Sequence, residues 1–117
     1  MKHNIVEEKS YAFALRVIRL YKYLCIKNEY ELSKQILRSG TSIGANVEEA
    51  IGGQSTKDFI SKLSIAYKEA RETHYWLRLL HDSDYIETKD FETIIHDCNE
   101  LLKLIGSIQK TTKFRNS

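Results

Sequence analysis

Apolar and polar residues alternate at helical spacing along almost the whole chain, most clearly between residues 35 and 50. On a 3.6-residue period, one narrow face of this segment is small and apolar, and the adjoining stripe is polar. The face consists of Ile36, Gly40, Ile43, Val47 and Ala50, and the stripe of Gln35, Ser39, Ser42, Asn46 and Glu49. Gly40 and Gly44 leave room for a neighbouring backbone. The segment is therefore predicted to be a closely packed helix whose polar edge needs hydrogen-bond partners.

The same periodicity predicts an all-α protein. The expected helices cover residues 5–28, 32–51, 56–82 and 88–110, followed by a basic tail over residues 111–117. Pro is absent and there are only 5 Gly, so little interrupts long helices. Four amphipathic helices with short connections are typical of an antiparallel up-down-up-down four-helix bundle, and we predict one such domain over residues 1–117.

Capping signals support the predicted helix boundaries. Gly52 and Gly53 supply the permissive backbone of a helix end. Ser55, followed three positions later by Asp58, resembles a capping box and begins the third helix. Thr88 is the expected N-cap of the fourth helix. The second, third and fourth helices are thus bounded by capping chemistry as well as by periodicity.

The first predicted helix carries two apolar stripes. One consists of Tyr11, Ala14, Leu15, Ile18, Tyr21 and Cys25, and the other of Phe13, Val17, Leu20 and Leu24. A helix in a monomeric bundle needs only one such stripe, so we expect the second to meet another subunit. We assign the oligomer interface to Phe13, Val17, Leu20 and Leu24, although the pattern alone leaves open which stripe faces inward. The alternative is that the helix is simply more central in its own bundle.

Composition and charge indicate a soluble globular protein. The chain has 18 basic and 16 acidic residues, a formal net charge of only +2, so any basic surface must come from how the charges are distributed. The apolar runs are far shorter than a membrane span. Without a secretory signal at the N-terminus, a cytoplasmic location is expected. Cys25 and Cys98 have no paired spacing and are interpreted as buried, inert thiols.

The chain carries no recognisable catalytic, cofactor or metal site. Di-metal bundles need Glu-x-x-His on two helices, and no glutamate here precedes a histidine by three positions. His74 and His81 are interpreted as partly buried structural residues. Asn46, Glu48 and Glu49 lack a nucleophile or histidine at fixed spacing and are interpreted as packing groups, with Asn46 capping or bridging a neighbouring backbone or ordering a subunit contact. We therefore expect a protein that is not an enzyme.

The motifs of the second and third helices resemble a known family. Leu37-Arg38 is followed by Ser42-Ile43-x-x-Asn46-Val47-x-Glu49, then by Phe59-Ile60-x-x-Leu63-x-Ile65-Ala66 and an aromatic-leucine run. This arrangement resembles the four-helix-bundle family of bacterial intervening-sequence proteins, named for reading frames in insertions within large-subunit ribosomal RNA genes. Accessory proteins of diversity-generating retroelements resemble the same family. The likeness spans most of the chain, and it identifies Ser42, Ile43, Asn46 and Glu49 as structural motif residues.

The resemblance implies a cytoplasmic bundle that assembles as a ring-like homopentamer, with no established enzymatic activity. It also implies a connection to nucleic acid, because the retroelement members are thought to bind nucleic acid and a reverse transcriptase through a basic surface. The family commonly has Pro at the position of Gly44 and Gly at that of Ala50, and both departures point to a subfamily.

Two functions compete on this basis. The first is a homo-oligomeric accessory protein that binds RNA, DNA or a nucleic-acid-processing protein. The basic side chains expected to carry that binding are Arg16, Arg19, Lys22, Lys103, Lys110, Lys113 and Arg115. The alternative is a protein–protein interaction scaffold with no role in nucleic-acid binding. The tyrosines of the helices are interpreted as core and interface residues rather than as stacking platforms.

Overall fold

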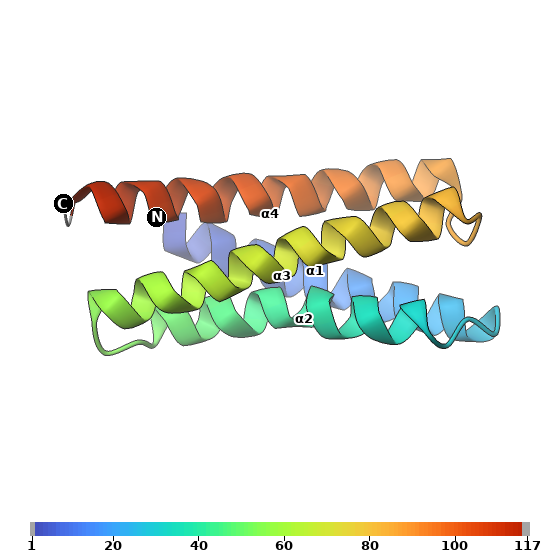
Figure 1. Ribbon diagram of the computed structural model, residues 1–117, viewed down its shortest axis with the longest axis horizontal. Helices are drawn as coiled ribbons and strands as arrows, with labels where there is room; N and C mark the ends of the chain where they lie inside the picture. Colours follow the sequence, from blue (N-terminus) through green and yellow to red (C-terminus); the bar gives the residue numbers. More distant parts are fainter. Residues whose placement is uncertain (1, 116–117) are drawn as a thin grey trace.

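Long helices account for nearly all of the computed structural model, which describes the backbone of residues 2–115 and the side chains of residues 5–113. The helices are α1 (Lys2–Ile26), α2 (Leu32–Ile51), α3 (Thr56–Asp82) and α4 (Thr88–Arg115). They run alternately up and down the long axis, so that both chain termini lie at one end (Figure 1). The predicted antiparallel four-helix bundle is confirmed. Within the described residues, no helix is long and apolar enough to cross a membrane.

The predicted boundaries of α2 and α3 agree with the structure, whereas those of α1 and α4 differ. α1 ends at Ile26 rather than at residue 28, because Asn28 adopts a left-handed φ of 63°. Asn28 N donates to Cys25 O and Glu29 N to Leu24 O, the two bonds of a Schellman helix end. Asp84, with φ 69°, ends α3 in the same way. Both turns therefore form without glycine.

Capping is confirmed at one predicted position and corrected at another. The Ser55 hydroxyl accepts a hydrogen bond from Asp58 N at the start of α3, as predicted. Thr88 is the first residue of α4 rather than its N-cap, and Phe91 N donates to Glu87 O. The helix also continues to Arg115, so the prediction of a separate tail from residue 111 is wrong over residues 111–115. No Gly or Pro interrupts this stretch, and the Thr112 hydroxyl bonds to Ile108 O within the helix.

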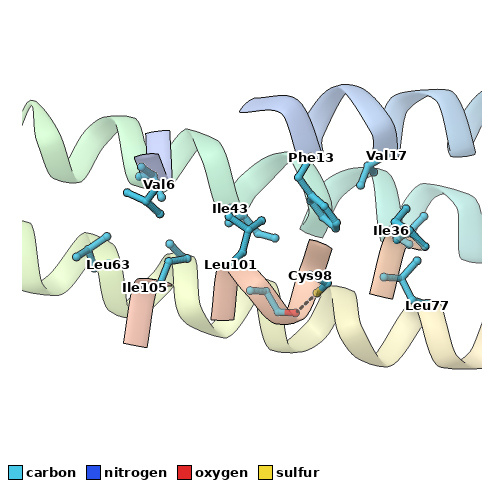
Figure 2. Close-up of a cluster of buried hydrophobic side chains, with 14 of the residues drawn as sticks. Val6, Phe13, Val17, Ile36, Ile43, Leu63, Leu77, Cys98, Leu101 and Ile105 are labelled. Carbon is cyan, nitrogen blue, oxygen red and sulfur yellow. Dashed lines mark hydrogen bonds between the residues drawn. The ribbon is translucent and has the colours of Figure 1, made fainter. Parts of the chain in front are cut away.

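The core runs the length of the bundle and draws on all four helices (Figure 2). Ile36, Ile43 and Val47 of α2 are fully buried, which confirms the apolar face predicted for this helix. Each helix packs against its neighbours in sequence, and α4 closes the ring on α1 less tightly than the other pairs pack. The α1–α4 seam and the outer surfaces of the helices are therefore the places to look for a functional site.

Candidate functional site

The second apolar stripe of α1 lies in the chain's own core. Phe13, Val17 and Leu24 are buried within one chain, and Val17 has no exposed surface. Side chains buried in this way cannot contact a second copy, so the interface assignment is wrong for these three residues. Leu20 is partly buried and packs against the same core. The two stripes are equally apolar in the sequence, and only the docking of α2 and α4 decides which one faces inward.

The other stripe of α1, which we call the α1 outer stripe, faces away from the core. Tyr11 is 65% exposed and Leu15 is 42% exposed. The remaining members are partly buried and include Ala14, Ile18, Tyr21 and Cys25. A row of exposed apolar and aromatic side chains along one helix is a feature of surfaces that bind other proteins. This stripe is therefore the better candidate for a contact between copies.

Two of the predicted basic residues of α1, Arg16 and Arg19, lie beside acids of α4. Arg16 Nη1 donates to Asp97 Oδ2 at 2.8 Å, and Arg16 Nη2 donates to the Thr93 hydroxyl. Further along the same seam, Lys9 of α1 pairs with Glu100 of α4 at 3.1 Å. Arg19 lines two small hollows of about 240 and 280 Å³ in this seam, whose linings also contain acids of α4. The seam is therefore close to charge-balanced.

The predicted basic residues of α4 form a separate group. Lys103, Lys110 and Lys113 are exposed, and the seven-residue spacing of Lys103 and Lys110 places them on one face. Arg115 ends α4, and its side chain lies outside the described residues. Lys110 is 13 residues beyond Asp97, the partner of Arg16, or roughly 20 Å along the helix. Lys22, the remaining predicted residue, is exposed on α1. The seven predicted residues therefore do not form one patch.

The sequence pattern did not single out a segregation of charges on α3. The two glutamates of this helix, Glu69 and Glu72, turn toward α2, where Arg38 Nη1 lies 3.1 Å from Glu69 Oε2 and Arg38 Nη2 contacts Glu72. Trp76 Nε1 also donates to Glu72 Oε2, at 2.9 Å. Arg38 of α2 therefore neutralises both of these carboxylates. Two arginines of α3, Arg71 and Arg78, lie instead toward α4.

Between α3 and α4 there is a hollow of about 670 Å³, the α3–α4 hollow. It is lined by Arg71, Glu72, His74, Tyr75, Arg78, Asn99 and Leu102. Among the described residues, neither Arg71 nor Arg78 forms an ion pair. The Arg78 guanidinium lies over the Tyr75 ring, 5.8 Å from its centroid. The hollow therefore combines two uncompensated guanidiniums with an aromatic ring, whereas its acid, Glu72, is already paired.

The pKa of the His74 imidazole depends on the burial and the charges in the hollow. Burial lowers its pKa below the ordinary value, and the positive charges of Arg78 and Arg71 lower it further. A hydrogen bond with Asn99 acts in the opposite direction. At neutral pH the ring is therefore predominantly neutral, with one nitrogen able to donate and the other able to accept. The two arginines that contribute to the depressed pKa also create a positive local potential, which favours an anionic ligand.

The family-motif residues of α2 make contacts that stabilise the fold. Ile43 is fully buried. The Ser42 hydroxyl donates to Arg38 O, and Asn46 Nδ2 donates to Ser42 O, both within the helix. The expectation that Asn46 reaches a neighbouring backbone is therefore wrong. Glu49 pairs with Lys62 of α3 at 3.0 Å and so joins the two helices.

The remaining candidate residues also serve the fold. Burial raises the pKa of the Cys98 thiol to about 12, which makes it unreactive, whereas Cys25 is partly exposed, contrary to expectation. His81 stacks on Phe91 at 4.2 Å and bonds to Thr88, linking the ends of α3 and α4. Within the described part of the chain, no group of three or more His, Cys, Asp or Glu could hold a metal ion.

Comparisons with known proteins give a family and a close structural neighbour. The family model described as 23S rRNA-intervening sequence protein matches residues 2–107. A crystal structure from Bacteroides thetaiotaomicron, described as a protein with unknown function from the S23 ribosomal protein family, is 54% identical, with a TM-score of 0.92. The match covers 94% of this chain and 99% of that one. No protein with a curated description matches the chain.

Proposed function

The chain belongs to the family of 23S rRNA-intervening sequence proteins, and from this premise we propose that it is a non-enzymatic, homo-oligomeric accessory protein that associates with nucleic acid or a ribonucleoprotein. The observation that carries the proposal is the sorting of charge on α3, where Glu69 and Glu72 are paired toward α2 and Arg71 and Arg78 face the α3–α4 hollow. A net charge of +2 does not by itself favour an anionic partner, but a local group of unpaired guanidiniums does.

Lys68 extends this basic surface. Lys68, Arg71 and Arg78 follow one another at spacings of three and seven residues on the same side of α3, with Tyr75 between the two arginines. The row spans ten residues, or roughly 15 Å of helix. Lys103 of α4 is exposed next to Leu102, which lines the hollow. Such a row suits the regularly spaced phosphates of a nucleic-acid strand, which Arg contacts through paired N–H donors.

We expect the protein to bind a fluorescent RNA of about 16 nucleotides with an affinity that falls steeply with salt. If three cations contact phosphates, the slope of log K against log salt is roughly −2 for a single strand. The substitution Arg71→Glu should make the slope shallower by roughly 0.7 and weaken binding at least tenfold at ~50 mM salt. Fluorescence anisotropy over a salt series measures both quantities.

The matched control is Lys34→Glu, which changes the charge equally at an exposed position of α2. It should reduce affinity only slightly, because its effect acts through net charge alone. If Arg71→Glu and Lys34→Glu weaken binding equally, the α3–α4 hollow is not the contact surface. Absence of binding at ~50 mM salt contradicts nucleic-acid association and favours the protein-scaffold function.

We also propose that copies of the chain associate through the α1 outer stripe, with the pentamer of the family resemblance as the expected assembly. Tyr11 and Leu15 support this proposal, because their exposure leaves apolar surface in contact with water in the single chain. Their positions, four residues apart, put both on one side of α1. Association would bury this surface without disturbing the core.

Leu15→Glu should lower the mass in light scattering toward the 13.7 kDa of one chain, while the helical circular dichroism is retained. The reason is that a charge on the α1 outer stripe opposes association but lies outside the core. Ile65→Glu is the control, since Ile65 of α3 is 40% exposed and Leu15 42%. A wild-type mass of 13.7 kDa at micromolar concentration would rule out the oligomer.

A further inference from the structure

We propose that the α3–α4 hollow receives an unpaired base of single-stranded nucleic acid, stacked on Tyr75 and held by polar groups from both helices. The inference rests on the proposed function and deepens it, because it names the form of nucleic acid that the surface selects. Phosphate contacts alone do not distinguish a single strand from a duplex. A hollow that contains an exposed aromatic ring and neutral hydrogen-bonding groups does.

Tyr75 has the surroundings of a stacking platform. Its side chain is 48% exposed although it lines the hollow. The ring packs edge-on against Trp76, with centroids 5.1 Å apart and an interplanar angle of 63°. Trp76 is in turn held by its hydrogen bond to Glu72. The tyrosine ring is therefore held by Trp76 while about half of the side chain stays exposed, so that a base can stack on it with little loss of side-chain freedom. Such a base would share the ring with the Arg78 guanidinium, which lies 5.8 Å from the ring centroid.

The hollow also contains groups that can bond to the edge of a base. His74 from α3 and Asn99 from α4 both line it. A neutral imidazole and a carboxamide each present a donor and an acceptor, which is the complement of a base edge. Leu102 adds apolar surface to the lining. Phosphate binding would use only the flanking Arg71 and Arg78, which leaves these neutral groups available to a base.

A duplex cannot use this combination. Its bases are stacked and paired, so it would offer the α3 row only its phosphates. A single strand can place phosphates beside the two arginines and turn one base into the hollow between them. Stacking of one base on an aromatic side chain contributes about 1–3 kcal/mol, roughly five- to a hundredfold in affinity. The structure thus favours single strands by a measurable margin.

The test compares a fluorescent single strand of RNA of about 16 nucleotides with the corresponding RNA duplex at the same salt concentration. Wild-type protein should bind the single strand roughly tenfold more tightly. Tyr75→Leu should remove most of this preference and leave duplex binding and the salt slope unchanged. Tyr30→Leu is the control, because Tyr30 is 49% exposed but lies in the α1–α2 connection.

The outcomes separate the two proposals. Loss of the single-strand preference in Tyr75→Leu but not in Tyr30→Leu supports the stacked base. Equal affinity for both probes, unchanged by Tyr75→Leu, overturns the inference and leaves salt-dependent nucleic-acid association intact. Failure of both probes to bind overturns the inference together with the proposed function. Retention of the wild-type circular dichroism by both variants shows that any change in binding arises at the exposed ring.

Discussion

Glu29→Ala should lower the free energy of unfolding by about 2–3 kcal/mol, although Glu29 lies in a connection and not in a helix. Its largely buried carboxylate accepts hydrogen bonds from the backbone N–H groups of Glu31, Leu32 and Ser33, at 3.2, 3.1 and 2.7 Å. These groups begin α2 and have no partner within the helix. The negative charge also lies at the positive end of the α2 dipole.

Chemical denaturation followed by circular dichroism measures the effect, with Glu31→Ala as the control. Glu31 occupies the N-cap position of α2, but its side chain makes no capping hydrogen bond. Its replacement should therefore change stability by less than about 0.5 kcal/mol. Equal protein concentrations are needed, because self-association stabilises the folded state in a concentration-dependent way. Equal stabilities of the two variants would show that Glu29 does not cap the helix.

Glu29 also illustrates what periodicity could and could not predict about the fold. The bounds of α2 and α3 follow from apolar spacing and from local signals such as Gly52 and Ser55. The first connection carries no such signal, because its left-handed residue is Asn28 and its cap comes from a glutamate three residues before Leu32. The local turn geometry after Asn28 decides whether the Glu29 side chain reaches the start of the next helix. The sequence alone does not encode this in a recognised pattern.

The two apolar stripes of α1 show a second limit of what the sequence predicts about the fold. Both Val17 and Leu15 lie in apolar rows, and periodicity predicts the rows correctly. Which row is buried depends on where α2 and α4 dock, and this is a property of the whole bundle. Gly40 held part of that information: a glycine on the buried face of α2 indicates the point of closest approach, and the residue that meets it is Val17. Reading the two helices together would have placed the Val17 row inside.

The candidate site could have been found by the same comparison of faces within one helix. Arg71 and Arg78 are seven residues apart and share a side of α3, whereas Glu69 and Glu72 lie on another side. Along the chain the basic and acidic residues of this segment are interleaved, so their separation appears only when the sides of the helix are compared. The pairing of both acids with Arg38 could not be predicted, because it depends on the register of α2 against α3. The position of Asn99 in the site could not be predicted either, because it depends on how α4 packs against α3.

Gly40→Ala should destabilise the protein by up to about 2 kcal/mol even though alanine is the stronger helix former. A Cβ on Gly40 would lie 2.7 and 2.8 Å from the two Cγ atoms of Val17. Val17 is fully buried and β-branched, so it has no other rotamer available without disturbing the core. The overpacking should cost about 1–3 kcal/mol, and the helix propensity of alanine offsets only about 1 kcal/mol of it.

Gly106→Ala is the matched control, because a Cβ there would meet Tyr67 Cε1 at an ordinary 3.6 Å. This substitution in the interior of α4 should stabilise the protein by up to ~1 kcal/mol, so the two Gly→Ala changes are expected to differ in sign. The Val17 methyl groups cause the clash, so Gly40→Ala should cost little when it is introduced into Val17→Ala. A double-mutant cycle in urea measures this coupling. A cost of Gly40→Ala that is independent of residue 17 would mean that α1 and α2 do not approach at this point.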